Sequence, residues 1–446
     1  MKKEFSNYSI GDKILVKYKA NLEDDITIEK EGFFIPRPDY YDDNTFVFKL
    51  KSGYNIGIDI EKIIEIKLIE KYDNNKNKIN TKEEKTKNEK RNVNEQYDKK
   101  ICIIGLGGTI ASKVDYRTGG VVANLKNEDL FDLLPSLKKY NVDVDIVMNE
   151  MSENFNDEIY KKIAKSVEQK IKEGYQGLIL MHGTDTLHYT SSILNFMLRN
   201  LKIPIIITGS QRSIDRGSSD AFLNLELSCK ALNYIDFGKV IVGFHENESD
   251  DSIILINGTK TRKMHSSKRD AFKPINELPI ARITKEKVEL IDKEKYYFDN
   301  EIIKSKKELQ GEFFIDDKLS KKVAILYFFP NIDPKVIDSM YEIGYRVFVV
   351  MGTGLGHVES NDFLDKISSY KDKAIFFMAT QTIYGRTNEF VYSNLRKASK
   401  SLIYLGDMIA ETIFCKAKVF YEKDNFLENM KKNFSDEILE DDIDNN

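Results

Sequence analysis

Apolar and polar residues alternate with a period of two through the first seventy residues of the chain. Ile14, Val16 and Tyr18 fall on one face of a strand, and the same alternation recurs three more times before residue 70. Glycine and proline residues separate these stretches, as turns require. Four or five short strands in so short a segment are typical of a small barrel. Residues 1–70 are therefore predicted to form a small N-terminal β-barrel.

Beyond the first hundred residues, short apolar runs alternate with stripes of helical period. Residues 101–104 and 177–181 have the uninterrupted apolar composition of buried strands. Between them, Ile159 and Ile163 belong to a stripe that predicts a helix, and Gly174 fits its C-terminal stop. Strands and helices that alternate in this way are typical of a doubly wound parallel α/β sheet.

A second strand–helix series follows a polar interval at about residues 284–320, which is expected to hold surface strands or a domain crossover. We therefore expect two α/β domains, at residues 99–315 and 316–425. Residues 71–98 are too poor in apolar side chains to fold alone, and they are predicted to be a charged, solvated linker rather than an RNA contact. Residues 426–446 are expected to form an acidic tail, a frayed helix followed by disorder, with an interaction tail as the alternative.

Composition narrows the class of protein. The chain has 446 residues, 41% of them hydrophobic, and a net charge of −4 that neither requires nor excludes a nucleic-acid partner. Its three cysteines lack CxxC spacing and its five histidines lack metal-ligand spacing, so we expect no metal site and a reducing compartment. The N-terminus lacks a signal-peptide pattern and the apolar runs are strand-length, so a soluble cytoplasmic protein without membrane contact is expected.

A glycine-rich turn follows the first strand of the α/β region. The sequence Gly105-Leu106-Gly107-Gly108-Thr109 allows a tight turn and a close approach of backbone N–H groups to a ligand, and then presents the Thr109 hydroxyl. Taken alone, the motif also fits an ordinary turn or a nucleotide loop. The glycines lack the G-x-G-x-x-G spacing of a dinucleotide site.

Two further motifs bring in a second threonine, an aspartate and a lysine. Thr184-Asp185-Thr186 lies between a predicted strand and a predicted helix, where Asp185 could serve only as the helix N-cap. Lys263 lies in a basic run, which is usually a solvated face. A lysine held between a threonine and an aspartate could instead move protons. Because open α/β folds keep their chemistry at the carboxyl edge of the sheet, these side chains suggest a hydroxyl nucleophile there.

In their order and approximate spacing, these motifs resemble the bacterial-type asparaginase family across roughly residues 99–425. The resemblance implies an asparaginase-like fold of two doubly wound α/β domains and amide hydrolysis through a threonine nucleophile. Thr109 would attack the side-chain amide carbon, and Thr184, Asp185 and Lys263 would form the proton-transfer relay. Backbone N–H groups of the glycine-rich turn would hold the oxyanion. Which threonine attacks first stays open.

Three more residues match substrate-binding positions of that family. Ser152 and Glu153 stand where the family binds the substrate's α-amino and α-carboxylate groups, with Glu153 in place of the usual glutamine. Tyr116 matches the tyrosine of the family's mobile lid. Each has a plainer alternative, since Glu153 could be a charge at a helix start and Tyr116 a surface aromatic residue.

One branch of the family resembles the chain more closely. The sequences at Gln211-Arg212-Ser213 and around Lys263, together with an N-terminal barrel that plain asparaginases lack, resemble the GatD branch, a component of the archaeal glutamyl-tRNA(Gln) amidotransferases. The resemblance implies an SH3-like barrel and a glutaminase subunit. It would release ammonia from glutamine so that misacylated Glu-tRNA(Gln) becomes Gln-tRNA(Gln).

The same resemblance implies partners and cofactors. The chain would form a homodimer within a heterotetramer with GatE, the other component of that amidotransferase. GatE would hold tRNA(Gln) and use ATP with Mg²⁺, so no cofactor is expected in this chain. Two alternatives stay open. One is a free-standing asparaginase or glutaminase, which the N-terminal barrel argues against. The other is a catalytically inert RNA-binding protein, which the intact threonines, aspartate and lysine argue against.

Overall fold

The computed structural model describes residues 8–9, 11–20, 26–35, 45–50, 55–71, 97–108, 110, 112–114, 121–123, 130–131, 133–214, 219–307 and 310–439. These residues fall into two compact units, one drawn from residues 1–96 and 112–124 and the other from residues 97–111 and 125–446. None of the helices in the described ranges is long and apolar enough to cross a lipid bilayer.

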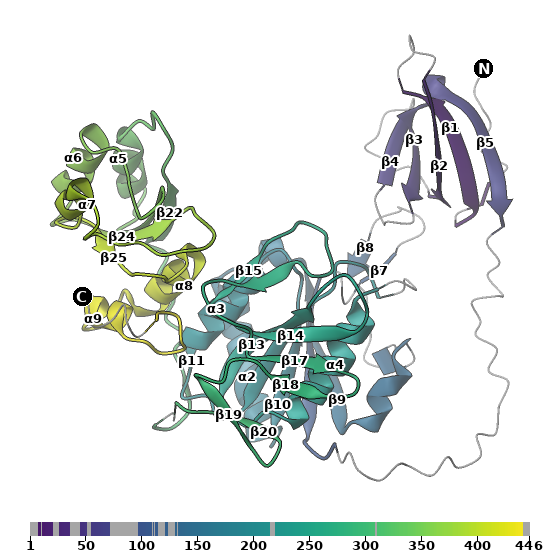
Figure 1. The fold of residues 1–446 in the computed structure, drawn as a ribbon, viewed down its shortest axis with the longest axis horizontal. Helices are drawn as coiled ribbons and strands as arrows, with labels where there is room; N and C mark the ends of the chain where they lie inside the picture. The colour runs from purple at the N-terminus through teal and green to yellow at the C-terminus, as the bar shows by residue number, and fades with distance from the viewer. Residues whose placement is uncertain are drawn as a thin grey trace. The chain divides into compact units, whose positions relative to one another are not determined.

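The first unit contains a five-stranded antiparallel sheet, drawn in purple in Figure 1. The strands lie in the order β4-β3-β2-β1-β5, and they are β1 (Lys13–Lys19), β2 (Thr27–Phe34), β3 (Thr45–Leu50), β4 (Asn55–Asp59) and β5 (Ile63–Glu70), with a 3-10 turn η2 (Ile60–Lys62) before β5. Ile14, Val16 and Phe48 are fully buried, because alternate positions along a strand share one face. The small N-terminal sheet predicted from this alternation is confirmed.

Two details of the first unit differ from or add to that prediction. Among the described strands no ladder joins β4 to β5, which lie at the two ends of the strand order. A short hairpin of β7 (Ser112–Val114) and β8 (Val121–Ala123) belongs to the same unit.

The second unit is built on an eight-stranded mixed sheet in the order β18-β17-β14-β13-β12-β10-β6-β9. Its strands are β6 (Ile101–Gly107), β9 (Val142–Glu150), β10 (Gly177–Met181), β12 (Pro204–Thr208), β13 (Lys239–His245), β14 (Ser252–Asn257), β17 (Ala281–Thr284) and β18 (Val288–Leu290). The five strands from β9 to β13 run parallel, as the α/β alternation predicts. The remaining three strands join the sheet through antiparallel ladders, and the short connection from β13 to β14 leaves no room for a crossover helix between those two.

Helices cover both faces of this sheet. They are α2 (Asp157–Lys172), α3 (Leu187–Met197) and α4 (Ala221–Asn233), with 3-10 turns η4 (Pro135–Lys139) and η5 (Ser152–Asn154). In β10, Leu178 and Leu180 pack with α2 and α3, while Ile179 and Met181 pack with α4. The side chain of Asn156 caps α2 by accepting the N–H groups of its first turn, so the predicted helix begins where expected.

Four short ladders lie outside the large sheet. Two of them join strands close in sequence, β15 (Thr261–Lys263) with β16 (Phe272–Pro274) and β19 (Tyr296–Asp299) with β20 (Ile302–Ser305). The third joins strands far apart in the chain, β11 (Leu198–Arg199) and β21 (Phe314–Ile315). The fourth is the β7–β8 pair of the first unit. The polar interval at 284–320 thus holds short strands, one of the two interpretations given above.

The second α/β domain carries a four-stranded parallel sheet, β22 to β25 in chain order, in yellow-green in Figure 1. The strands are β22 (Val323–Tyr327), β23 (Val347–Gly352), β24 (Ile375–Thr380) and β25 (Ile403–Tyr404), and the helices are α5 (Lys335–Glu342), α6 (Asp362–Ser369), α7 (Ser393–Ala398), α8 (Ala410–Phe420) and α9 (Phe426–Lys431). Helix α8 packs on α3, and Phe420 meets Phe196 edge to face with ring centroids 6.3 Å apart. The two α/β domains therefore share one apolar core.

The C-terminal segment differs from the prediction of a frayed acidic tail. After α9 the chain packs against the second unit, and Ser435, Glu437 and Ile438 are buried. Glu437 forms an ion pair of 2.7 Å with Lys416, and both side chains are fully buried. The acidic residues serve as counter-ions for buried lysines, which holds the segment in place. Residues 440–446, and residues 72–96 of the predicted linker, lie outside the described residues.

Candidate active site

Three loops meet at the carboxyl edge of the parallel strands. Strand β9 lies on one side of β6 in the sheet, and the next strand in the chain, β10, lies on the other side of β6. The loops after these strands therefore flank a topological switch point. Open α/β sheets bind ligands at such points. The loop after β6 carries the glycine-rich turn, the loop after β9 carries Ser152, and the loop after β10 carries Thr184. Motifs that lie far apart in the sequence are thereby placed side by side.

Glycine is required where two of these loops touch. A Cβ on Gly108 would lie 2.2 Å from the Cα of Gly183, and Gly108 has a φ of +75°. A Cβ on Gly183 would in turn lie 2.8 Å from the Cβ of Ser152. The Gly108 N–H donates to the carbonyl of Glu150 at 3.0 Å, so this N–H is used within the fold and an oxyanion would need other N–H groups of the turn.

Replacing Gly108 with alanine is expected to abolish the site, because the added methyl group would overlap the backbone of Gly183. A matched control is Gly174→Ala. Gly174 also has a positive φ, +81°, but a Cβ there meets nothing within 4 Å. We expect the control to lose only about 1 kcal/mol of stability through backbone strain. Amidase assays and urea unfolding of both variants test this, and equal behaviour of the two would contradict it.

The centre of the site is a lysine that bridges a hydroxyl and a carboxylate. The Nζ of Lys263 donates to the Oγ1 of Thr184 at 2.8 Å and to the Oδ1 of Asp185 at 2.7 Å. The lysine arrives on β15, while the other two residues follow β10. Thr184 is 7% exposed and the Lys263 side chain 10%, whereas the Asp185 side chain is 68% exposed. A hydroxyl, an amine and a carboxylate in line can pass a proton from one to the next.

His182 fixes the loop that carries Thr184. Its Nδ1 lies 2.6 Å from the carbonyl of Gly183 and its Nε2 lies 2.8 Å from the Oγ1 of Thr190. Because a carbonyl only accepts, Nδ1 carries the proton and Nε2 accepts from the threonine. Complete burial lowers the pKa of His182 to about 4, so the ring is neutral at physiological pH. His182 orders the loop and is not placed as a proton carrier.

This burial predicts a dependence of stability on pH. In the unfolded chain His182 takes up a proton near pH 6.5, but in the folded chain only near pH 4. Between these values the unfolded state binds more protons, so stability falls as the pH drops, by about 3 kcal/mol in all. We expect His182→Gln to flatten the curve of unfolding free energy over this range. Urea unfolding of the wild-type and variant chains at a series of pH values measures the difference.

His188 is a neighbour of the site that the sequence motifs do not reveal. It is buried in the first turn of α3. Burial, and then the charges of Arg262 and Lys263, lower its pKa to about 3, so a neutral ring lies beside the lysine. Among the described residues its Nδ1 has no hydrogen-bond partner. Its place in the first turn of the helix that follows Thr184 and Asp185 is the one signal that could have indicated it.

The predicted substrate-binding residues divide into three groups. Ser152 is 2% exposed and is tied to the Thr184 loop, because its carbonyl accepts the Thr186 hydroxyl at 2.7 Å and its Oγ accepts the Thr186 N–H at 3.4 Å. Glu153 is the next residue and is exposed. Tyr116 lies outside the described residues, as does the predicted nucleophile Thr109, although the next residue, Ile110, is described and fully buried.

Within the described ranges, no group of three or more His, Cys, Asp or Glu side chains could hold a metal ion. The three cysteines, Cys102, Cys229 and Cys415, are buried and unpaired with one another. Burial raises the pKa of the Cys102 thiol to about 12, so this thiol is protonated and unreactive at neutral pH.

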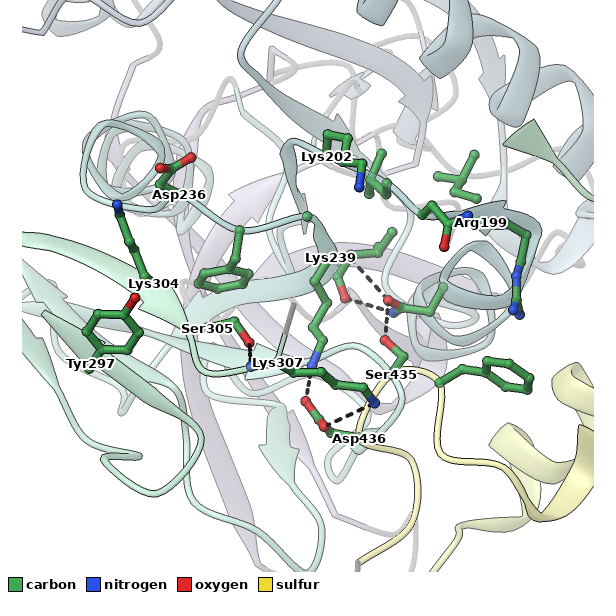
Figure 2. A pocket seen from close by; sticks show the side chains of 18 residues that line it. Arg199, Lys202, Asp236, Lys239, Tyr297, Lys304, Ser305, Lys307, Ser435 and Asp436 are labelled. Atoms are coloured by element: carbon green, nitrogen blue, oxygen red, sulfur yellow. Dashed lines mark hydrogen bonds and ion pairs between the residues drawn. The ribbon is translucent and has the colours of Figure 1, made fainter. Parts of the chain in front are cut away.

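A cavity lies at the edge of the sheet opposite the threonine–lysine–aspartate site. This cavity of about 460 Å³ is lined by Lys239, the first residue of β13, and by Lys202, which precedes β12. Figure 2 shows Lys239 and Lys307 both directed at Asp436 of the C-terminal segment. The amino ends of these strands lie roughly 16 Å from their carboxyl ends, the length of five residues. This cavity is separate from the threonine–lysine–aspartate site.

Comparison with known proteins gives the family. Residues 100–296 match the family model of the asparaginase N-terminal domain, and residues 322–434 match that of the glutaminase/asparaginase C-terminal domain. Residues 8–69 match the GatD N-terminal domain. The GatD component of the glutamyl-tRNA(Gln) amidotransferase from Methanosphaera stadtmanae is 38% identical over 93% of this chain and 89% of its own length. The chain belongs to the GatD family.

Other GatD relatives and solved structures agree. GatD of Pyrococcus furiosus is 36% identical over 96% of this chain and 94% of its own. The L-asparaginase from Thermococcus kodakarensis superposes with a TM-score of 0.66 at 28% identity, over 76% of this chain and 99% of that one. L-asparaginase I from Vibrio cholerae, at 23% identity, has the same fold with a TM-score of 0.64. The predicted asparaginase-like α/β fold is confirmed, and the chain is an enzyme subunit of the amidotransferase type.

Proposed function

We propose that this chain is the glutaminase subunit of a glutamyl-tRNA(Gln) amidotransferase and releases ammonia from glutamine. The observation that carries the proposal is the Nζ of Lys263, held 2.8 Å from the Thr184 hydroxyl and 2.7 Å from the Asp185 carboxylate at the switch point of the sheet. The match to the GatD N-terminal domain supports the tRNA-dependent reaction over a free-standing asparaginase.

In the proposed reaction, a threonine oxygen attacks the side-chain amide carbon of glutamine. Thr109 is the proposed nucleophile, and Lys263 with Thr184 and Asp185 takes the proton from the attacking oxygen and returns it to the leaving nitrogen. Ammonia leaves, and a glutamyl ester remains on the threonine. Water then attacks the ester, the relay transfers one proton back to the threonine oxygen, and glutamate is released. The order in which Thr109 and Thr184 act stays open.

The substrate's other end is proposed to bind beside Ser152. The exposed carboxylate of Glu153 is proposed to pair with the α-ammonium group of the substrate glutamine. The glutamine residue that asparaginases usually have at this position would make the same contact without a charge. Tyr116 is proposed to cover the bound substrate. Because Ser152 is buried against Thr186, the backbone that presents Glu153 is held rigidly to the Thr184 loop.

The partners and cofactors of the reaction are also proposals. A homodimer of this chain would assemble with two copies of GatE into a heterotetramer. GatE would bind tRNA(Gln) and use ATP with Mg²⁺ to activate the misacylated glutamate that receives the ammonia. The match of residues 8–69 to the GatD N-terminal domain supports an assembly of this kind.

The experiment is an ammonia-release assay on the full chain, alone and together with GatE, with glutamine or asparagine as substrate. We expect glutamine hydrolysis that rises when GatE and Glu-tRNA(Gln) are present. Full-speed asparagine hydrolysis by the chain alone, with no gain from partner or tRNA, would favour a free-standing asparaginase. No hydrolysis of either amide under any condition would exclude an amidase.

A further inference from the structure

The strand that carries Lys263 needs support from outside the large sheet. Strand β15 has three residues and pairs only with β16 among the described strands. A two-stranded ladder of this length is not stable by itself. Yet the Lys263 ammonium must stay within hydrogen-bond reach of both Thr184 and Asp185, since proton transfer fails at longer distances. Other contacts must therefore fix the backbone of this strand.

The second α/β domain supplies these contacts from one short stretch, residues 407–412. Thr412 donates its hydroxyl to the carbonyl of Thr259 at 2.6 Å, and Glu411 pairs with the Nε of Arg262 at 3.2 Å. Both residues lie in the first turn of α8. The two contacts fix Thr259 and Arg262, and Arg262 is the residue immediately before Lys263.

The third contact is a buried ion pair. Lys260 pairs with the carboxylate of Asp407 and also donates to its carbonyl at 3.1 Å. The side chains of Lys260 and Asp407 are 0% and 2% exposed. The other carboxylate oxygen of Asp407 accepts the N–H of Leu439 at 2.9 Å. A buried ammonium with one counter-ion is held strongly in place, because any displacement would leave its charge uncompensated.

We propose that Asp407 is a positioning residue for the amidase reaction: through Lys260, it sets the backbone from which Lys263 reaches Thr184 and Asp185. The second domain thus acts in the chemistry without touching the substrate. This inference rests on the proposed function, because it assigns Asp407 a role in the same site.

Simple loss of stability must be separated from this role, and the chain offers a matched control. The Lys416–Glu437 pair is equally buried, with both side chains at 0% exposure and an N–O distance of 2.7 Å. Glu437 contacts Lys416 and the N–H groups of residues 434 and 435, and makes no hydrogen bond to β15. Losing either carboxylate costs a buried ion pair. Asp407 binds Lys260, the residue before β15, directly, whereas Glu437 reaches this segment only through Ser435, whose carbonyl accepts the Thr259 hydroxyl at 2.9 Å.

The test compares Asp407→Asn with Glu437→Gln in the full chain assembled with GatE. The kcat, the KM for glutamine and the pH profile of kcat are measured, with rates corrected for the folded fraction. We expect Asp407→Asn to lower kcat at least tenfold, with KM changed less than twofold and a shifted pH profile. Glu437→Gln should keep kcat within twofold of wild type and a superimposable profile.

Equal kcat losses in the two variants, or wild-type kcat in folded Asp407→Asn, would overturn the inference. If Asp407→Asn does not fold, Glu411→Ala decides, because it removes one contact to the same strand. A severalfold lower kcat at constant KM supports the inference, and wild-type kcat overturns it. If the wild-type chain has no amidase activity, the proposed function and the inference are both wrong. If the wild type is active and folded Asp407→Asn is equally active, only the inference is wrong.

Discussion

Replacing Lys263 with methionine is expected to lower kcat for glutamine hydrolysis by about 10²–10⁴-fold, the range that a positioned proton carrier contributes. Methionine preserves the apolar stem of the side chain, so packing on β15 is kept while the ammonium is lost. Methionine cannot make the two hydrogen bonds that the Nζ of Lys263 donates, to Thr184 at 2.8 Å and to Asp185 at 2.7 Å. Ammonia release under saturating glutamine, with the folded fraction checked by circular dichroism, measures the effect.

Lys268→Met is the matched control for this variant. Lys268 lies five residues further along the chain, and its half-exposed side chain makes a 3.8 Å ion pair with Glu248. Exposed pairs of this kind contribute little, so we expect kcat within twofold of wild type. A Lys263→Met chain that hydrolyses glutamine at the rate of this control would remove Lys263 from the mechanism.

Replacing Glu437 with glutamine is expected to give the largest change in stability among single carboxylate variants of the C-terminal segment. The change leaves the Lys416 ammonium buried without a counter-ion, which costs about 3–5 kcal/mol in comparable pairs. Glu437 also accepts N–H groups from Phe434 and Ser435, at 3.0 and 2.6 Å for the closest contacts. Equilibrium unfolding in urea measures the difference from wild type.

The Lys416–Glu437 pair also predicts how the free energy of unfolding changes with pH. Burial alone would raise the pKa of the Glu437 carboxyl, but the Lys416 charge outweighs it and holds the pKa below its ordinary value. The stabilisation is therefore fully present above about pH 4.3, the value in an unfolded chain, and is lost as the pH falls through the lower folded value. Glu437→Gln should lack this acid-dependent loss. Glu428→Gln, which breaks an exposed pair with Lys432, should change stability by less than about 1 kcal/mol.

Much of the site could be predicted because it depends on local patterns. Apolar runs that end in Gly107-Gly108 and in Gly183-Thr184 predict strands of one parallel sheet, and parallel strands present their carboxyl ends at a common edge. The structure brings those two loops into backbone contact. Helix α2 was equally predictable, since its apolar stripe and the capping Asn156 are both local signals.

Other features could not be predicted because their partners lie far away in the chain. Asp436 and Glu437 have the composition of a solvated tail, and only the fold shows that they meet Lys239 and Lys416. Strand direction is a similar case, because the apolar run of β14 is the same whether it pairs parallel or antiparallel with β13. Asp407 has no signal of its own, since its partner Lys260 is 147 residues away.

The contact between α3 and α8 limits how modular this protein can be. The boundary near residue 315 separates the segments that match two different domain families. It is not a boundary between independent folding units, because one apolar core crosses it. A fragment that ends there would present the buried face of α3, including Phe196, to water and would be prone to aggregate. A chimera that exchanges one half would therefore have to exchange the facing helix as well.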